Sequence, residues 1–259
     1  MQTSPLILTV LAGLSTGLGG VLAVLGKPTE KLLAASAGFA GGGMLTASLT
    51  DLLPEALHFY GRYLPPLACG GALATLTALG MAAAGLLGKL LPEESELAAR
   101  FGQGRDPARA AAMRTALITG AALLLHNFPE GVLTFFAGTA DPALGLRTAA
   151  AIALHNIPEG LAVAVPFAYA TRSRAAGVLA ALVSGLAEPL GAVLAWLFLR
   201  RFFTPGFLNG TVVLAAGIMV WVSFARLLPD AFAPKHRAAG ILGAAAGTLL
   251  MLLGIAALP

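Results

Sequence analysis

Residues 126–131 read His-Asn-Phe-Pro-Glu-Gly and residues 155–160 read His-Asn-Ile-Pro-Glu-Gly, so one hexapeptide occurs twice, 29 positions apart. Each copy lies inside a long run of apolar residues. A histidine and a glutamate are unfavourable in such surroundings unless they have a role there. We interpret the two hexapeptides, called the cassettes below, as the halves of one polar site, and the rest of the chain as the structure that holds it.

The bulk composition indicates an integral membrane protein. Of the 259 residues, 58% are hydrophobic and 11% are charged, whereas soluble domains carry roughly 25% charged residues. The formal charge of +4 does not indicate binding to nucleic acid, because the basic residues are spread over short segments rather than gathered in one patch. The single cysteine, Cys69, excludes a disulfide framework and a thiolate metal cluster.

Eight apolar runs are each long enough to cross a bilayer, which takes about 20 residues. The runs are continuous rather than alternating, and only helices or closed barrels satisfy the backbone in lipid. We therefore expect an all-α polytopic membrane protein with a single transmembrane domain over residues 1–259. The longest connection, 90–111, is predicted to be a mobile loop. The predicted helices lie near 5–25, 33–53, 67–91, 112–137, 145–169, 175–199, 209–229 and 237–258.

The distribution of lysine and arginine predicts the orientation of the chain in the membrane. If the connections after the first, third, fifth and seventh helices face the cytoplasm, that side holds 12 of the 16 basic residues and the other side holds four. The positive-inside rule then places both termini outside the cytoplasm and the 90–111 loop inside it.

A second repeat joins the second and seventh predicted helices. Residues 52–56 read Leu-Leu-Pro-Glu-Ala and residues 227–231 read Leu-Leu-Pro-Asp-Ala, 175 positions apart, and a methionine and a serine precede each copy at the same spacing. These two helices run in opposite directions, and so do the two consecutive helices that carry the cassettes. Such inverted repeats are typical of secondary transporters, whose binding site lies near the midplane of the membrane.

The residue types of the cassettes are those of a divalent metal site. Residues four apart on a helix share a face, so the histidine and the glutamate of each cassette point the same way. The cassette proline leaves the carbonyl group of Leu125 or Leu154, four residues earlier, without its helical partner, and is predicted to kink the helix. Imidazole, carboxylate, amide and carbonyl groups suit zinc, iron(II), manganese, cobalt, nickel or cadmium, and the lack of thiolates disfavours copper(I).

Three glutamates, Glu130, Glu159 and Glu188, are predicted to lie in the middle of membrane helices. A charged group at that depth costs about 2.5–3.5 kcal/mol on insertion scales. No basic residue is expected there to pair with them, so a divalent cation is the natural counter-charge, with protonation of the carboxyl groups as the other solution. Glu188 follows Glu159 by 29 positions and is expected to join the site. The remaining alternative is that these polar groups only bond the helices to one another.

These features together resemble the ZIP (Zrt-, Irt-like protein) family of divalent metal transporters, and most closely its bacterial, broad-specificity zinc-uptake branch. The resemblance rests on the two cassettes, on residues 184–189 (Ser-Gly-Leu-Ala-Glu-Pro) and on the Leu-Leu-Pro-Glu and Leu-Leu-Pro-Asp ends of the second and seventh helices. It extends over essentially the whole chain.

The resemblance implies eight helices in a 3+2+3 inverted-repeat arrangement, with metal bound between the fourth and fifth helices. It also implies a homodimer in the bacterial plasma (inner) membrane. This dimer would act as a secondary transporter that moves Zn²⁺ and related ions (Fe²⁺, Mn²⁺, Co²⁺, Cd²⁺) into the cytoplasm, with these ions as bound substrates and no separate cofactor. The residues that the resemblance implies as metal ligands are His126, Asn127, Glu130, His155, Asn156, Glu159, Glu188 and Met44.

Two neighbouring ions are implied within this set of ligands. The histidine of the first cassette and both cassette glutamates would hold one ion. The two asparagines, Glu159 and Glu188 would hold the other, and Met44 would touch the site. The family is also thought to move helices 1, 4, 5 and 6 as a bundle against helices 2, 3, 7 and 8. This chain departs from many relatives in having no histidine between Lys89 and Arg114.

A second functional class, a metal-dependent intramembrane hydrolase, could use the same side chains. Such an enzyme needs a general base and an open coordination position. The chain contains no His-Glu-x-x-His motif, and paired cassettes with inverted helix ends suit a conduit better than a one-sided active site. Transport is therefore the predicted function.

Overall fold

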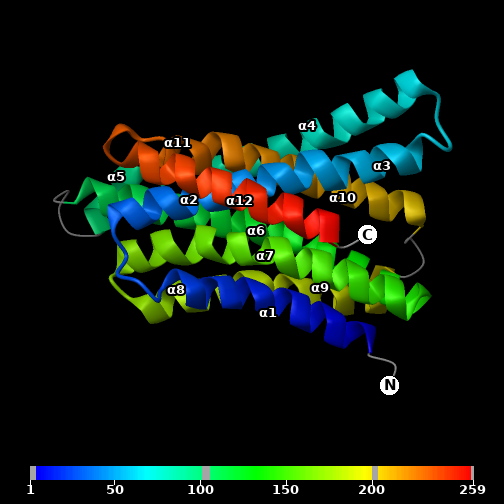
Figure 1. The fold of residues 1–259 in the computed structure, drawn as a ribbon, viewed down its shortest axis with the longest axis horizontal. Coiled ribbons are helices and arrows are strands. Elements are labelled where there is room, and N and C mark those ends of the chain that lie inside the picture. Colours follow the sequence, from blue (N-terminus) through cyan, green and yellow to red (C-terminus); the bar gives the residue numbers. More distant parts are fainter. Residues whose placement is uncertain (1–3, 101–105, 200–203, 258–259) are drawn as a thin grey trace.

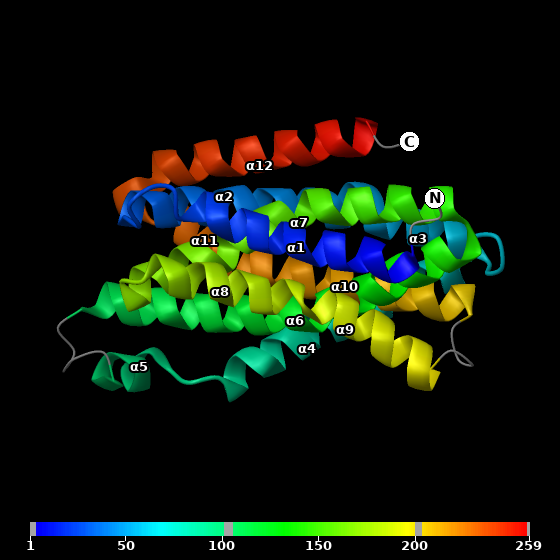
Figure 2. The same ribbon diagram turned by 90° about the horizontal axis from the view of Figure 1, so that it is seen from below.

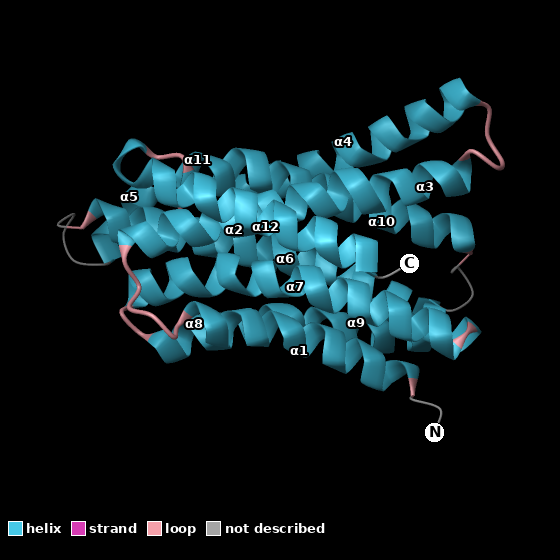
Figure 3. Ribbon diagram, viewed as in Figure 1, coloured by secondary structure: helices cyan, strands magenta, loops and turns pink. Residues whose placement is uncertain are grey.

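The protein consists of helices packed side by side in a computed structural model that describes residues 4–100, 106–199 and 204–257 (Figure 1). No strand occurs in this part of the chain, and Figure 3 shows helices joined by short connections. The α-helices are α1 (Pro5–Ala23), α2 (Glu30–Ala47), α3 (Leu53–Tyr60), α4 (Pro66–Leu90), α5 (Glu94–Arg100), α6 (Pro107–Ala140), α7 (Pro142–Thr171), α8 (Arg174–Gly185), α9 (Ala187–Leu194), α10 (Pro205–Val222), α11 (Leu228–Ala231) and α12 (Arg237–Ala257).

Eight helical segments in the described residues are long and apolar enough to cross a membrane. The predicted all-α class and the eight spans are confirmed, and the chain is a multi-pass membrane protein. Five spans correspond to the single helices α1, α4, α6, α7 and α12, some with a short extension. The other three join α2 with α3, α8 with α9, and α10 with α11.

Each of the three composite spans contains a short π-helical segment. The segments are Ser48–Leu52 between α2 and α3, Ala195–Leu199 after α9, and Ser223–Leu227 between α10 and α11. The first and the third end directly before a Leu-Pro pair. Because proline interrupts the α-helical hydrogen-bond ladder, the wider turn before it keeps each span continuous. π-helical turns of this kind are frequent near functional sites.

The connection over 90–111, predicted as a loop, is partly helical. α5 occupies Glu94–Arg100, and its Leu97 is buried against the start of α6. α6 itself begins at Pro107. The polar, glycine-containing composition suggested a loop, but one leucine on the inner face gives the short helix an apolar contact with α6. Residues 101–105, which belong to the same predicted loop, lie outside the described residues.

The two cassette helices, α6 and α7, pack on each other and run through the middle of the bundle (Figures 1 and 2). α1 lies against α7 and α8, and α9 lies against α6. α2 contacts α12 and α7, whereas α10 contacts α4 and α6. Both chain ends lie at the same end of the bundle, as an even number of crossings requires (Figures 1 and 2).

Small residues bring the helices into backbone contact, which is a common way to pack helices in lipid. A Cβ atom added to Gly243 of α12 would collide with the carbonyl oxygen of Ala35 on α2. One added to Gly247 would collide with the carbonyl oxygen of Phe39. α2 and α12 therefore touch along their backbones and leave no room for larger side chains.

Replacing Gly243 by valine is expected to lower the stability of the protein by about 1–3 kcal/mol or more, because the new side chain must push α12 away from α2. Gly71→Val on α4 is the matched control, since no atom lies within 4 Å of a Cβ added there. Thermal unfolding of both purified variants in one detergent measures the difference. Equal melting temperatures for the two variants would contradict the close contact between α2 and α12.

Candidate metal centre

α6 and α7 form a helical hairpin that turns at Asp141. This residue ends α6 and caps α7, and its carboxylate accepts hydrogen bonds from the backbone N–H groups of Ala143 and Leu144 at 2.7 and 3.1 Å. His126 and His155 lie at almost equal separations along the chain on either side of this turn. The two cassettes therefore come level with each other on adjacent, antiparallel helices.

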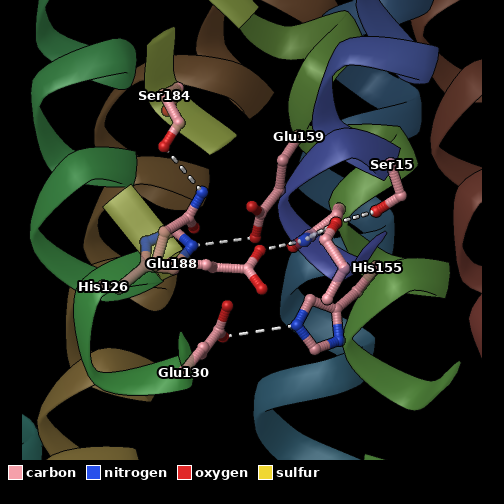
Figure 4. Close-up of polar contacts among 10 residues, drawn as sticks. Ser15, His126, Glu130, His155, Glu159, Ser184 and Glu188 are labelled. Carbon is pink, nitrogen blue, oxygen red and sulfur yellow. Dashed lines mark hydrogen bonds and ion pairs between the residues drawn. The ribbon is translucent and has the colours of Figure 1, made fainter. Parts of the chain in front are cut away.

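Each cassette histidine pairs with the glutamate of the other cassette. His126 Nε2 lies 2.9 Å from Glu159 Oε1, and His155 Nε2 lies 3.3 Å from Glu130 Oε1. All four side chains are buried, and Figure 4 shows the two glutamates and His155 around one space between the helices. The prediction that the histidine and the glutamate of a cassette share a helix face agrees with this arrangement.

The expectation that nothing basic pairs with the mid-membrane acids needs correction for the cassette glutamates. Sequence spacing relates a histidine only to the glutamate of its own cassette, four residues away. The antiparallel hairpin instead sets it opposite the glutamate of the other cassette. A neutral imidazole donates one hydrogen bond to a carboxylate, and a protonated one also supplies a counter-charge. For Glu188 the expectation holds among the described residues, because its partner is the neutral amide of Asn156.

Asn156 joins the cassettes to the flanking helices α1 and α9. Its side-chain nitrogen donates to Glu188 Oε1 on α9 and, over 2.9 Å, to the backbone carbonyl of Ala12 on α1. Glu188 is fully buried. It stands in the first turn of α9, after a break in the helix at Leu186. Pro189 explains this break, since it has no N–H to continue the ladder from α8.

Asn127 joins the first cassette to α8 in a corresponding way. Its side-chain nitrogen donates to the backbone carbonyl of Ser184 over 3.4 Å. The other end of the amide lies 3.0 Å from His126 Nε2 and 3.2 Å from Glu159 Oε2, so a rotated amide donates to Glu159, and to His126 only when that ring nitrogen carries no proton. In either orientation Asn127 touches the His126–Glu159 pair.

Four buried polar atoms of the predicted ligand residues have no hydrogen-bond partner among the described residues. They are His126 Nδ1, Glu130 Oε2, Asn156 Oδ1 and Glu188 Oε2. An unsatisfied buried polar group costs about 1–3 kcal/mol, and more when it is charged. One imidazole nitrogen and three oxygens are the ligand types that zinc and similar divalent cations prefer. The site therefore fits such a cation chemically.

The same groups do not form a ready-made cage. In the described residues, no three side chains of His, Cys, Asp or Glu stand close enough together to hold a metal ion. The imidazoles and carboxylates are engaged with one another instead. A cation that enters must break these pairs, which weakens its net binding relative to a preformed site.

Met44, the eighth predicted ligand, lies in an apolar environment. It is fully buried in a cluster that includes Leu123, Met219 and Leu227. Its thioether is a soft ligand, unlike the nitrogen and oxygen atoms of the cassettes. The role of Met44 as a ligand stays a prediction.

Two acceptors at the site escaped the reasoning from sequence, namely the backbone carbonyl groups of Ala12 and Ser184. Every residue carries a carbonyl group, so its use as an acceptor leaves no mark on residue type. Ser184 lies in the segment that carried part of the family resemblance, but nothing in the cassettes pointed to α1.

Access to the site differs between its two sides. A cavity of about 220 Å³, with Glu30, Asp230 and His236 among its lining residues, extends to Ala162, three residues after Glu159. On the other side a pocket of about 60 Å³ is lined by residues that include Asp51 and Leu154. The larger of these two cavities thus lies toward the end of the bundle where α2 begins.

Comparison with known proteins bears on the family. The sequence profile described as "ZIP Zinc transporter" matches residues 86–256, which is more than half of the chain. The chain belongs to the ZIP family. The family resemblance inferred from the cassettes is thereby confirmed, and this ZIP protein is a transporter and not an enzyme. The alternative of an intramembrane hydrolase is set aside.

Curated relatives match this ZIP protein over nearly its whole length. The zinc transporter ZupT of Akkermansia muciniphila is 43% identical over 258 residues, which cover 95% of this chain and 94% of that protein. ZupT of Corynebacterium efficiens is 40% identical over 258 residues, or 96% of this chain and 94% of the relative. ZupT of Escherichia coli O7:K1 is 43% identical over 233 residues, or 87% and 85%.

Replacing His126 by leucine is expected to destabilise this protein by about 3–5 kcal/mol, because Glu159 is left buried without its partner. Adding Glu159→Leu removes the orphaned carboxylate and should recover part of the loss. Unfolding of the purified variants in detergent without added metal measures both effects.

Lys235→Met is the control for this comparison, because it removes an exposed ion pair with Glu30 at 2.5 Å and should change the melting temperature little. If the His126→Leu protein and the double variant unfold at the same temperature, the buried pair does not contribute as described.

Proposed function

We propose that this ZIP protein carries Zn²⁺, and with it Fe²⁺, Mn²⁺, Co²⁺ and Cd²⁺, across the bacterial plasma membrane into the cytoplasm. The observation that carries the proposal is the group of unsatisfied nitrogen and oxygen atoms around the crossed His–Glu pairs, deep inside the bundle. The zinc transporters of the same family, at 40–43% identity, support zinc as the substrate.

The crossed pairs suit a site that must bind its cargo and release it again. Without cargo, each imidazole satisfies a carboxylate and holds it in the low-dielectric interior. When a cation enters, the carboxylates and imidazoles turn to it, and the cation supplies the positive charge that they lack. Because the pairs reform when the cation leaves, both states are tolerated, and the cation is held less tightly than in a closed structural site.

The proposed ligands are the seven polar residues first identified from the sequence, with Met44 as a further contact. Two neighbouring ions fit the donors, as the family resemblance implies. The histidine of the first cassette would hold one of them together with Glu130 and Glu159. The two asparagines would hold the other together with Glu159 and Glu188. The bond between Asn156 and Glu188 supports the second grouping.

An inverted 3+2+3 repeat is part of the proposal, and the packing supports it. If spans 1–3 correspond to spans 6–8 and span 4 to span 5, each contact should have a counterpart. α2 packs on α12 and α7, while α10 packs on α4 and α6. The π-helical segments Ser48–Leu52 and Ser223–Leu227 occupy the same place in spans 2 and 7, at the offset of the Leu-Leu-Pro repeat.

Transport would proceed by alternating access at this site. The cavity of about 220 Å³ on one side and the pocket of about 60 Å³ on the other are consistent with a state open to the side where α2 begins. α1, α8 and α9 pack mainly on the cassette helices, while α4 and α12 pack mainly on α10 and α2. This division supports movement of the first group against the second.

Two further features of the proposal concern the whole protein. Both termini are placed outside the cytoplasm, because the more basic end of the bundle is the opposite one. A homodimer is proposed from the family resemblance. It is consistent with the exposure of α4 and α12. In the most apolar stretch of their spans only 17% and 22% of the residues are buried within the chain, so one side of each helix is free for lipid or for a second copy.

Replacing Glu159 by alanine is expected to lower zinc uptake into proteoliposomes at least tenfold, because this carboxylate belongs to both ions of the proposed site. Changes in the groups around a bound metal typically lower metal affinity or activity about 10–100-fold. Glu96→Ala is the matched control, since Glu96 is exposed on α5. Undiminished uptake by Glu159→Ala, measured with a zinc-sensitive dye inside the vesicles, would refute the proposed site.

Single cysteines test the orientation and hence the direction of import. Each cysteine is introduced into a Cys69→Ala protein, which lacks the buried native thiol. Position 62 lies between α3 and α4, and position 174 lies at the start of α8. Both Arg62 and Arg174 are exposed. A membrane-impermeant maleimide added to intact cells should label Arg62→Cys and not Arg174→Cys. The reverse pattern would invert the topology.

A further inference from the structure

A third internal repeat involves α1 and the helix break between α8 and α9. Residues 12–16 read Ala-Gly-Leu-Ser-Thr and residues 184–188 read Ser-Gly-Leu-Ala-Glu, 172 positions apart. A Leu-Gly pair follows two residues later in both segments. The repeat is short, but both segments border the candidate metal site, and their contacts correspond one by one.

The glycines of the two segments make matching backbone contacts. A Cβ added to Gly13 would collide with the carbonyl oxygen of Gly185, and one added to Gly185 would collide with that of Gly13. Gly19 lies in the same way against the carbonyl of Ile157, and Gly191 lies against that of Phe128. Ile157 and Phe128 are the third residues of the two cassettes. The two halves therefore pack as corresponding copies around a point between Gly13 and Gly185.

The final glycines of the cassettes continue the pattern. A Cβ on Gly131 would meet the carbonyl oxygen of Glu188, and a Cβ on Gly160 would meet the carbonyl oxygen of Thr16. Thr16 and Glu188 occupy the same position in the two copies of the repeat. Thr16 thus stands to the second cassette as Glu188 stands to the first.

The polar contacts of the site obey the same correspondence. Asn127 lies against the carbonyl of Ser184 and donates to it in one orientation of its amide, and Asn156 donates to the carbonyl of Ala12. The same correspondence matches one crossed His–Glu pair with the other, His126 and Glu159 with His155 and Glu130. One contact has no counterpart: Asn156 donates to the carboxylate of Glu188, and Thr16 offers no carboxylate to Asn127.

Thr16 is fully buried, and its hydroxyl has no hydrogen-bond partner among the described residues. Thr9, two turns earlier on α1, is equally buried but donates to the carbonyl of Leu6 over 2.8 Å. Threonine hydroxyls in helices commonly bond back in this way. Thr16 therefore keeps an unused polar atom at the position that corresponds to a ligand.

We infer that Thr16 is the position at which α1 sets the charge and the ligand number of the cation site, as the counterpart of Glu188 on α9. The inference rests on the proposed function. Zinc takes carboxylate oxygen and imidazole nitrogen as ligands, so a threonine here leaves one half of a pseudo-symmetric site without a negative ligand. The second ion of the proposed site is thus held on the Glu188 side, and a carboxylate moved to position 16 should serve in place of Glu188.

A relocation experiment tests this correspondence in the full-length protein. Glu188→Thr should lower zinc affinity about 10–100-fold, measured by equilibrium dialysis of the purified protein against zinc. The double variant Thr16→Glu/Glu188→Thr should regain most of that loss, because it restores one carboxylate ligand to the site. Uptake into proteoliposomes should follow the same order.

Thr9→Glu/Glu188→Thr is the matched control, because it places the same side chain on the same helix at an equally buried threonine, about 10 Å along the axis. It should bind zinc no better than Glu188→Thr. Thr16→Asp/Glu188→Thr repeats the test with a shorter side chain. If both variants at position 16 misfold while the Thr9 variant folds, no room for a ligand exists there and the inference is wrong.

Other outcomes separate this inference from the proposed function. If Glu159→Ala binds zinc as the wild type does, the proposed cargo site itself is wrong. If Glu159→Ala loses zinc but Glu188→Thr does not, or if position 16 restores no more binding than position 9, only the inference about Thr16 is overturned.

Discussion

The structure depends on one constraint, which is that carboxylates buried in the middle of a membrane need partners. Glu130, Glu159 and Glu188 are all shielded from solvent, at a depth where an unpaired charge is unfavourable by several kcal/mol. In this protein the partners are provided by two crossed His–Glu pairs and one amide–carboxylate contact. These contacts leave some donor and acceptor capacity unused, and that unused capacity is what a divalent cation can satisfy.

The rest of the bundle makes these contacts geometrically attainable. A tight turn at Asp141 sets the cassettes level with each other. The final glycine of each cassette then lets a neighbouring backbone approach, that of Glu188 at Gly131 and that of Thr16 at Gly160. In a cassette the histidine, asparagine and glutamate therefore supply the polar groups, and the glycine leaves room for the backbones of α1 and α9 to approach them.

The same features explain why the site suits a transporter better than a storage protein. A preformed cage binds zinc strongly and releases it slowly. Side chains that are hydrogen-bonded to one another must first give up those bonds, which lowers the net affinity for the ion. The cavity beside α7 reaches within a turn of Glu159, so open space lies close to the cassettes on that side. The near two-fold arrangement of the cassettes offers similar donors to both sides, with Glu188 and Thr16 as the point where the halves differ.

The sequence by itself determined the class of the protein, its eight spans and the cassettes, because these follow from hydropathy, length and residue type. The resemblance of its motifs to the ZIP family pointed to the family. It also singled out Glu188 through an unusual acid in an apolar run. The tertiary structure decided which groups meet. Sequence spacing relates His126 to Glu130, but the hairpin pairs His126 with Glu159, since contacts between antiparallel helices depend on register and rotation. The roles of the Ala12 and Ser184 carbonyl groups, and the helix within the connection over 90–111, also came only from the structure, because backbone acceptors and one well-placed leucine leave little trace in composition.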